Sequence, residues 1–326
     1  MELTRRELRT FSMLGCARSF FVHLTDKAKS NEDLVVLTAD VGSWVGLEKF
    51  QKQCPEQFYN IGIAEQNMVG IAAGMTKTGL NVFAMTYAVF ITARAFDQVR
   101  VNLGYMKYPI KLVGRSSGLF SSYLGATHYS WEDIALMRTI PNLTIVAPAD
   151  ALEAVKIAEV AVNFDKPMYI RLNDNVNVPM IYKEDYDFEI GRAIVLQEGA
   201  DVTIFATGTM VAPSLKAAKL LAEENISAAV VNVHTIKPLD IETVDNYSDG
   251  RKLIVSVEEH TIIGGLGSAI AEHNSEKKSA PPQLRIGLPD AYCKPGKYEY
   301  LLDKHGLTAE KICARIKQKL IGGYDV

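Results

Sequence analysis

A glutamate stands at the expected start of a helix in the segment YNIGIAEQNMVGIAAGMTKTG (59–79). The residues after Glu65 are small and apolar, and they include Gly70 and Gly74, so this helix can pack closely against a neighbour. A carboxylate in the first turn of a helix can simply interact with the helix dipole. The alternative is a buried carboxylate that acts as an acid or base toward a ligand. The local sequence leaves both interpretations open.

Two aromatic residues and a histidine form further candidates. Tyr87 and Phe90 stand three apart in TYAVFITARAFDQVR (86–100), a spacing that suits either a packed core or a platform for a planar heterocycle. His128 lies in the Gly- and Ser-rich stretch GRSSGLFSSYLGATHYSWED (114–133), between an expected strand and an expected helix. Loops at the carboxyl ends of parallel strands commonly hold ligand sites. This histidine could therefore exchange a proton or bind substrate, or it could be structural.

An arginine and a glycine-rich turn complete the set. Arg171 ends the expected strand in MYIRLND, where it could grip a phosphate or carboxylate, or make an ordinary ion pair. The turn EEHTIIGGLGSAI (258–270) has the spacing G-G-x-G, and no acidic residue closes a dinucleotide-binding pattern about 20 residues later. We therefore expect a tight turn into a helix there.

The elements that must position these residues alternate between strands and helices. Expected strands cover 34–40, 81–85, 110–114, 143–148, 168–172, 201–209, 228–235 and 252–260, and expected helices cover 65–77, 90–103, 150–163, 211–225, 264–276 and 308–320. Such alternation predicts parallel sheets with helices on both faces. The polar stretch 173–192 has no period and indicates a linker. The prediction is an α/β protein with two doubly wound parallel-sheet domains, residues 1–180 and 190–326.

Bulk properties limit the partners. The net charge is −3 over 326 residues, with both signs mixed along the chain, so we expect no nucleic-acid partner. No apolar run reaches the roughly 18–20 residues that span a bilayer, and the charged N-terminus is unlike a signal peptide, so we expect no membrane association. The four cysteines form no CxxC pair, which predicts free thiols in a reducing cytoplasm.

Taken in order, the motifs resemble the transketolase family over nearly the whole chain. The segments that carry the resemblance are TADVG (38–42), GIAEQN (62–67), TYAVF (86–90), ATHYSWEDIALMR (126–138), PNLTIVAPAD (141–150) and VEEHTIIGGLGSAIAE (257–272). The match is to the pyrimidine-binding and C-terminal domains of transketolases and of 1-deoxyxylulose 5-phosphate synthases. The β subunits of 2-oxo acid dehydrogenases share the layout.

The resemblance implies thiamine diphosphate as cofactor. It makes Glu65 the catalytic carboxyl group that contacts the aminopyrimidine ring, and His128 a second catalytic group. It also implies cofactor contacts from Asp40, Tyr87 and Phe90. The implied substrate contacts come from Ser43, Arg94, Arg115, His128 and Arg171, and no residue of this chain is expected to bind a metal.

In that family the diphosphate and Mg²⁺ are held by another domain, marked by the triplet GDG, which this sequence lacks. The resemblance therefore implies a separate N-terminal subunit, an α2β2 assembly with the cofactor between chains, and no activity for this chain alone. The implied reaction is transfer of a two-carbon ketol unit from a ketose to an aldehyde. The alternatives are decarboxylation of a 2-oxo acid, as in deoxyxylulose phosphate synthases or dehydrogenase β subunits, and a non-catalytic structural homologue.

Three departures concern the sugar substrate. Ordinary transketolases carry a G-x-D-G-x-T-H loop whose aspartate binds a substrate hydroxyl, and Leu124 stands at that position here. Tyr123 replaces a small or acidic residue, and Ser116 stands where transketolases have a histidine. Since a site that loses a buried partner for a hydroxyl loses discrimination for it, we expect a deoxy or otherwise altered sugar, a nucleotide-linked sugar, or a donor that lacks this hydroxyl.

Overall fold

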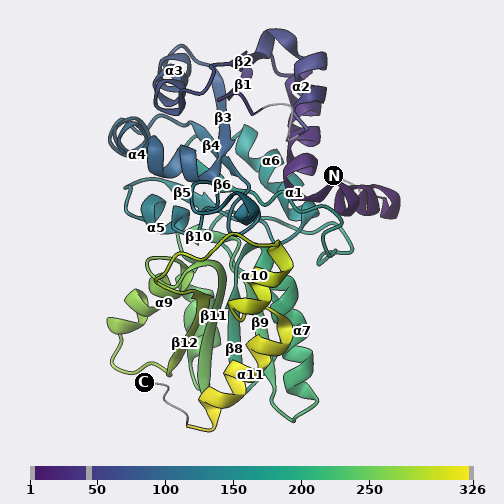
Figure 1. The fold of residues 1–326 in the computed structure, drawn as a ribbon, viewed down its shortest axis with the longest axis vertical. Coiled ribbons are helices and arrows are strands. Elements are labelled where there is room, and N and C mark those ends of the chain that lie inside the picture. The colour runs from purple at the N-terminus through teal and green to yellow at the C-terminus, as the bar shows by residue number, and fades with distance from the viewer. Residues whose placement is uncertain (1–3, 42–45, 323–326) are drawn as a thin grey trace.

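The computed structural model describes residues 4–41 and 46–322. Two sheet-centred units follow one another along the long axis of the molecule, the N-terminal unit above the C-terminal one in Figure 1. Each sheet is built mainly from parallel strands with helices on both faces, which confirms the predicted α/β class.

The first sheet has seven strands in the order β10-β5-β6-β4-β3-β1-β2. Its strands are β1 (Leu34–Thr38), β2 (Phe58–Asn60), β3 (Asn81–Tyr87), β4 (Lys111–Arg115), β5 (Thr144–Val146), β6 (Met168–Arg171) and β10 (Thr235–Lys237). All neighbouring pairs are parallel except β10 and β5. The carboxyl ends of β3 and β4 therefore bring Tyr87 and Arg115 to the same edge, where they are paired in register.

Alternating strand residues bury this sheet on two sides, as the period of a strand requires. Val36 and Phe83 face the core under α1 (Arg5–Ala28), α2 (Glu48–Gln53) and α6 (Ala151–Val162). Val35 and Val82 face the core under the opposite helices. Those are α3 (Glu65–Lys77), η3 (Phe90–Arg94), α4 (Phe96–Val99), η4 (Arg100–Tyr105) and α5 (Asp133–Arg138), and short turns η2 (Pro55–Gln57) and η5 (Ser122–Leu124) complete this unit.

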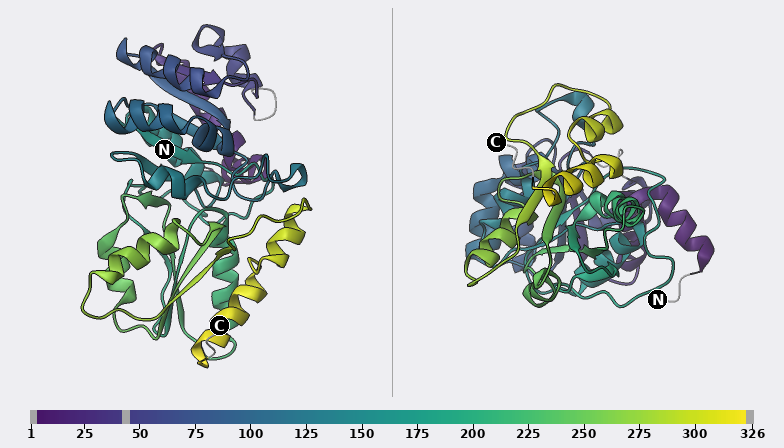
Figure 2. Two further views of the ribbon diagram at one scale, coloured as in Figure 1. Left: turned by 60° about the vertical axis from the view of Figure 1, so that its left-hand side comes forward. Right: turned by 90° about the horizontal axis from the view of Figure 1, so that it is seen from below.

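The second sheet has five strands in the order β12-β11-β8-β9-β7. They are β7 (Ile194–Gln197), β8 (Val202–Ala206), β9 (Ala228–Asn232), β11 (Leu253–Thr261) and β12 (Gln283–Leu288). The helices are η6 (Gly208–Met210), α7 (Val211–Ala222), α8 (Ile241–Ser248), α9 (Leu266–Ser275), α10 (Tyr298–Lys304) and α11 (Ala309–Leu320). Residues of α7 and α11 share one core, and residues of α8 and α9 share the other. Figure 2 shows the yellow C-terminal helices and the green α9 on opposite sides of this sheet.

Two details differ from the predicted pattern. The expected strand 228–235 is two strands, because the chain leaves β9 and adds β10 antiparallel to the edge of the first sheet. The expected helix 90–103 consists of two π-helical segments, η3 and η4, on either side of the short α4. Such π-segments often occur at functional sites. Residues 173–192, all of them described, form neither helix nor strand.

Helix α1 begins with a capping box formed by Thr4 and Glu7 and bends at Gly15. Gly15 has φ +80°, and a Cβ there would lie 1.9 Å from the carbonyl oxygen of Asn175, so only glycine fits this crossing. The bend lets the first turns project from the body (Figure 1), while Ala17 and Arg18 lie beside residues 174–176.

Within residues 4–41 and 46–322, no helix is both long and apolar enough to cross a bilayer. All four cysteines are described, and all are free thiols, as predicted.

Burial of a histidine between the two units predicts sensitivity to acid. His234 is fully buried against the Phe188 ring, and burial lowers its pKa from 6.5 to about 4. The unfolded chain takes up this proton below pH 6.5 and the folded chain does not until about pH 4, so stability is lost as the pH falls through that window. We expect His234→Gln to remove on the order of 2 kcal/mol of this loss. Urea unfolding at a series of pH values across that window measures it.

The control is His273→Gln, a substitution at a partly exposed histidine that is paired with Asp245. An equal pH dependence of unfolding in wild type and His234→Gln would contradict the assignment.

Candidate active site

Glu65 begins α3 and is 3% exposed. Nη1 of Arg94 donates hydrogen bonds to both of its carboxylate oxygens, at 2.9 Å each. The Arg94 side chain is 47% exposed, and its guanidinium lies 4.1 Å from the centroid of the Phe90 ring. The buried carboxylate is therefore held by a group that reaches it from the surface.

Tyr87, Phe90 and His128 form one aromatic cluster beside this pair. The Tyr87 and Phe90 rings meet edge to face at 5.7 Å, and the His128 ring meets them at 5.8 and 5.4 Å. Because Arg94 lies over Phe90, the cluster is continuous with Glu65. The structure thus brings together five residues predicted from three separate sequence segments.

His128 is half-buried on the loop that follows β4. Its Nδ1 lies 2.9 Å from Thr127 Oγ1, and its Nε2 has no hydrogen-bond partner among the residues that the structure describes. A histidine whose second nitrogen is free can donate to or accept from a ligand.

Arg115 ends β4 and is buried. Its Nε and Nη2 donate to one oxygen of Asp174, which also accepts from the hydroxyl of Ser116. The guanidinium lies 4.9 Å from the centroid of the Tyr87 ring, and its Nη1 has no partner in the described structure. Oδ1 of Asp174 is likewise buried without a partner, so the ion pair keeps one free donor and one free acceptor.

Arg115 and Tyr87 line a cavity of about 440 Å³, together with Ser116, Phe120, Tyr123 and Arg18. Arg18 is exposed and has no ion-pair or hydrogen-bond partner among the described residues. Sequence reasoning missed it, because an arginine on a helix far from the strand ends looks like an ordinary solvated residue. The bend of α1 at Gly15 is what brings Arg18 to the cavity.

Asp40 follows β1 with φ +60°, a backbone conformation that aspartate tolerates better than most residues. Its N–H donates to Asn60 Oδ1 at 3.1 Å, and its Oδ1 accepts from Asn60 Nδ2 at 2.9 Å. The predicted substrate residue Ser43 lies outside the described residues.

Arg171 does not join the cavity. It is 5% exposed, its Nε donates to Asp133 Oδ2 at 2.7 Å, and its Nη2 donates to the carbonyl oxygens of Ser130 and Glu259. The structure therefore places Arg171 in a buried ion pair. An ordinary ion pair was the predicted alternative to a contact with a phosphate or carboxylate.

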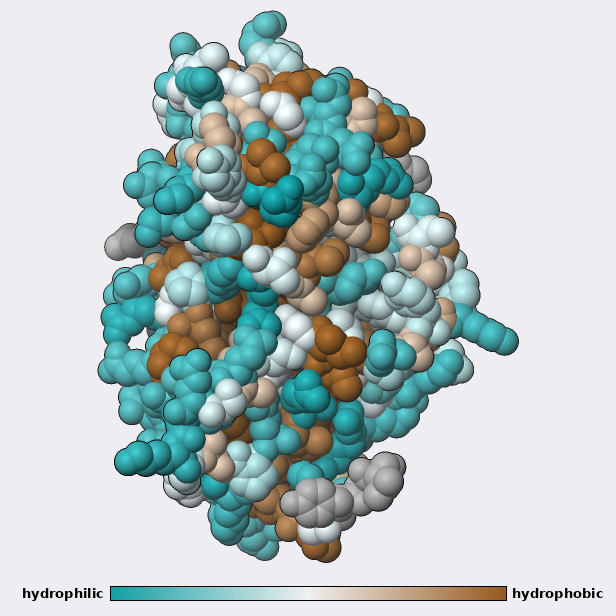
Figure 3. Space-filling view, turned by 90° about the vertical axis from the view of Figure 1, so that its left-hand side faces the viewer, coloured by the Kyte–Doolittle hydropathy of each residue, from teal (hydrophilic) through white to brown (hydrophobic). Residues whose placement is uncertain are grey.

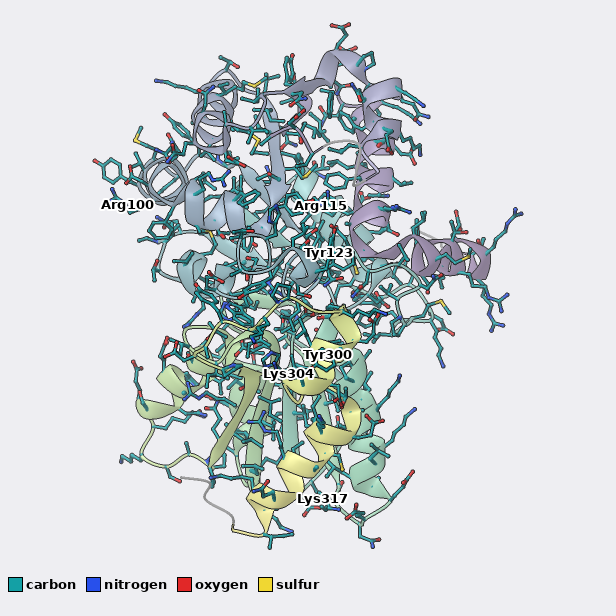
Figure 4. All side chains as sticks on the ribbon, in the orientation of Figure 1. Arg100, Arg115, Tyr123, Tyr300, Lys304 and Lys317 are labelled. Atoms are coloured by element: carbon teal, nitrogen blue, oxygen red, sulfur yellow. The ribbon has the colours of Figure 1, made fainter. Side chains whose placement is uncertain are left out.

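The two departures in the loop lie at its surface. Tyr123 and Leu124 are 65% and 43% exposed in η5, and Tyr123 lines the cavity. Glu299 of α10 also lines the cavity, so the cavity lies where the two units meet. Figure 4 shows Arg115 and Tyr123 in the upper unit, with Tyr300 of α10 below them.

Comparison with known proteins agrees with this geometry. Residues 22–176 match the model of the transketolase pyrimidine-binding domain, and residues 191–312 match that of the transketolase C-terminal domain. The chain belongs to the transketolase family. Within this family it is 38% identical over 303 residues to a subunit of the apulose-4-phosphate transketolase of Phocaeicola vulgatus, covering 93% of this chain and 96% of that one.

Two other transketolases are also similar to this chain. A 6-deoxy-6-sulfo-D-fructose transketolase subunit of a Clostridium species is 38% identical over 89% of each chain. A solved structure described as "Split gene transketolase, inactive beta4 tetramer" superimposes with a TM-score of 0.85 at 39% identity, covering 94% of this chain and 98% of that one.

The 1-deoxy-D-xylulose-5-phosphate synthase of Caldanaerobacter subterraneus is also similar, at 36% identity over 91% of this transketolase-family chain. The match spans only 47% of that enzyme. The match covers nearly the full length of the split transketolase chains but about half of a synthase, which favours the transketolase interpretation over the decarboxylating alternative.

The buried ion pair at the cavity predicts a stability effect. Asp174→Ala leaves the Arg115 guanidinium buried without its anion, so we expect a loss of about 3 kcal/mol in the free energy of unfolding. The control is Asp97→Ala, which breaks an exposed pair with Arg100, labelled in Figure 4, and should cost less than about 1 kcal/mol. Chemical denaturation of both variants measures the difference, and similar losses would show that Arg115 is not held as described.

Proposed function

We propose that this chain is the C-terminal subunit of a thiamine diphosphate-dependent transketolase that transfers a two-carbon ketol unit from a ketose to an aldehyde. The observation that supports it best is the buried Glu65 carboxylate, which is linked through Arg94 to the cluster of the Tyr87, Phe90 and His128 rings. Burial strengthens a hydrogen bond between a carboxyl group and a ring nitrogen, and water does not compete for the shared proton.

These residues suit the pyrimidine of the proposed cofactor. Glu65 would bind a ring nitrogen, Tyr87 and Phe90 would contact the ring faces and edges, and Asp40 would lie nearby. When bound, thiamine diphosphate supplies the carbanion chemistry that amino acid side chains lack. The chain's own part is to bind and orient the ring, hold a proton at Glu65 and exclude water. In this structure Arg94 is bonded to the Glu65 carboxylate. Because the Arg94 side chain is half exposed, it is able to turn toward the substrate.

We propose that a separate N-terminal subunit bearing a GDG triplet holds the diphosphate and Mg²⁺ in an α2β2 assembly. Two relatives are named as subunits and a third is described as the product of a split gene, which supports a second chain. Exposed apolar side chains beside α3 support it too. Ile63 is 78% exposed two residues before Glu65, and Tyr105 is 80% exposed at the end of η4, which packs on α3. On the face bearing these helices, hydrophobic patches interrupt a hydrophilic surface (Figure 3).

We propose that the substrate is a sugar with an anionic group. Arg18 and Arg115 both line the cavity, and guanidinium groups bind phosphate and sulfonate oxygens well. The names of two relatives specify a sugar phosphate and a sulfonated deoxy sugar. His128 Nε2 is a free donor or acceptor within the aromatic cluster, and Ser43 and Arg94 remain proposed contacts. Arg171, buried in its ion pair, is the proposed contact that the geometry favours least.

Replacement of Glu65 tests the proposed function. In the complex reconstituted with the N-terminal subunit, we expect Glu65→Gln to lower turnover by at least about 100-fold, since glutamine cannot share the proton with the ring. The fold should persist, because glutamine still accepts a bond from Arg94. Coupled assay of ketol transfer, with carbon dioxide release followed in parallel, measures the reaction.

The matched control is Glu48→Gln, at an exposed glutamate in the first turn of α2. Full activity in Glu65→Gln would remove Glu65 from the mechanism, and stoichiometric carbon dioxide release from pyruvate would favour decarboxylation.

The leucine in the substrate loop makes a prediction about specificity. We expect wild type to prefer a deoxy ketose phosphate over the ordinary one by about tenfold in kcat/KM, and Leu124→Asp to reduce or reverse this ratio. Leu124→Ala separates loss of the leucine from gain of the carboxylate. A clear wild-type preference for the ordinary ketose would contradict the role of Leu124.

A further inference from the structure

The loop between Ser116 and Ser130 carries the residues that face the cavity and the aromatic cluster, and its base is closed on itself. The N–H of Gly118 donates to the carbonyl of Ser130 at 2.7 Å, and the Ser130 N–H donates back at 3.0 Å. His128 precedes this closure by two residues, so the position of the base determines where its ring lies.

A carboxylate from the other unit holds this base. Glu259 of β11 is 1% exposed, and its Oε1 accepts from the N–H of Leu119 at 2.6 Å. Its Oε2 accepts from the hydroxyls of Thr209 and of Tyr298, the latter at 2.8 Å. Gly118 has φ +67°, and a Cβ there would lie 2.2 Å from Glu259 Oε1, so the loop approaches this carboxylate as closely as glycine allows.

Apolar side chains anchor the loop on either side of the Gly118–Ser130 closure. Leu119, Tyr129 and Trp131 are buried in the core of the second unit, among residues of α7 and α11. Farther along the loop, the hydroxyl of Ser122 donates to the carbonyl of Gly296 at 3.1 Å. The loop therefore belongs to the first unit in sequence and packs with the second.

We propose that Glu259 is a positioning residue that fixes the loop 116–130, and that the C-terminal unit serves the active site by holding this loop in place. Glu259 touches neither the cavity nor the aromatic cluster, and it acts through the Leu119 N–H and the Gly118–Ser130 closure. A buried carboxylate with three donors is strongly oriented, and removing it leaves the Leu119 N–H without its acceptor. That Glu259 orders the loop is independent of the proposed function. Only the effect of this order on catalysis rests on the proposed function.

Hydrogen exchange of the full chain tests the inference. We expect Glu259→Ala to speed exchange of the amides of residues 119–129 by about tenfold or more. Glu259→Gln should stay near wild type, because its oxygen can still accept from Leu119 while Thr209 and Tyr298 turn their hydroxyls to accept from its amide. In the reconstituted complex, Glu259→Ala should raise KM for an active ketose phosphate more than it lowers kcat.

The matched control is Glu258→Ala. Glu258 is equally buried on the same strand, but its carboxylate accepts from the N–H groups of Leu266 and Gly267 at the start of α9. Equal loop exchange in Glu258→Ala and Glu259→Ala, or unchanged loop exchange in Glu259→Ala, would overturn the proposal. If Glu259→Ala does not fold, Gly118→Ala disturbs the same contact from the loop side and should give the same local increase; normal loop exchange in it would also overturn the proposal. The exchange result is independent of whether the complex is a transketolase.

Discussion

The buried ion pair between Arg171 and Asp133 joins the parts of this molecule. Arg171 ends β6 and Asp133 begins α5, and the guanidinium also holds the carbonyls of Ser130 and Glu259. Tyr169 donates its hydroxyl to the same Asp133 oxygen at 2.7 Å. A charge buried to this degree is tolerated only when its partners are fixed. The pair therefore fixes the positions of three parts relative to one another: the first sheet, the loop before α5, and β11.

The site follows from that geometry. Tyr87 and Arg115 stand at the carboxyl ends of adjacent parallel strands, where α/β proteins commonly bind ligands. The loop after β4 then returns His128 to the aromatic pair, and the bend at Gly15 brings Arg18 to the cavity. One side of the site is the buried network in which Arg115 and Ser116 donate to one oxygen of Asp174, and the other is a carboxylate held by a half-exposed arginine. A ligand can therefore replace Arg94 at Glu65 without disturbing the buried network.

Much of this could be predicted from the sequence, because the information was local. Runs such as LVVLT (34–38) are buried strands by composition alone, and small residues after Glu65 indicate a closely packed helix. Other features depend on contacts between distant segments. The position of Arg171 at a strand end was predicted correctly, but position does not reveal whether its partner is a substrate or Asp133. Likewise β10 forms a strand only because the edge of β5 is available to it.

The account depends most on the coenzyme binding between two chains. The most direct measurement is calorimetric titration of thiamine diphosphate and Mg²⁺ into this chain, into the proposed N-terminal subunit, and into their equimolar mixture. The account predicts one coenzyme bound per pair of chains in the mixture, with binding at least about 100-fold weaker to either chain alone. Equal binding to the N-terminal subunit with and without this chain would contradict it, because Glu65 and its aromatic neighbours would then contribute nothing.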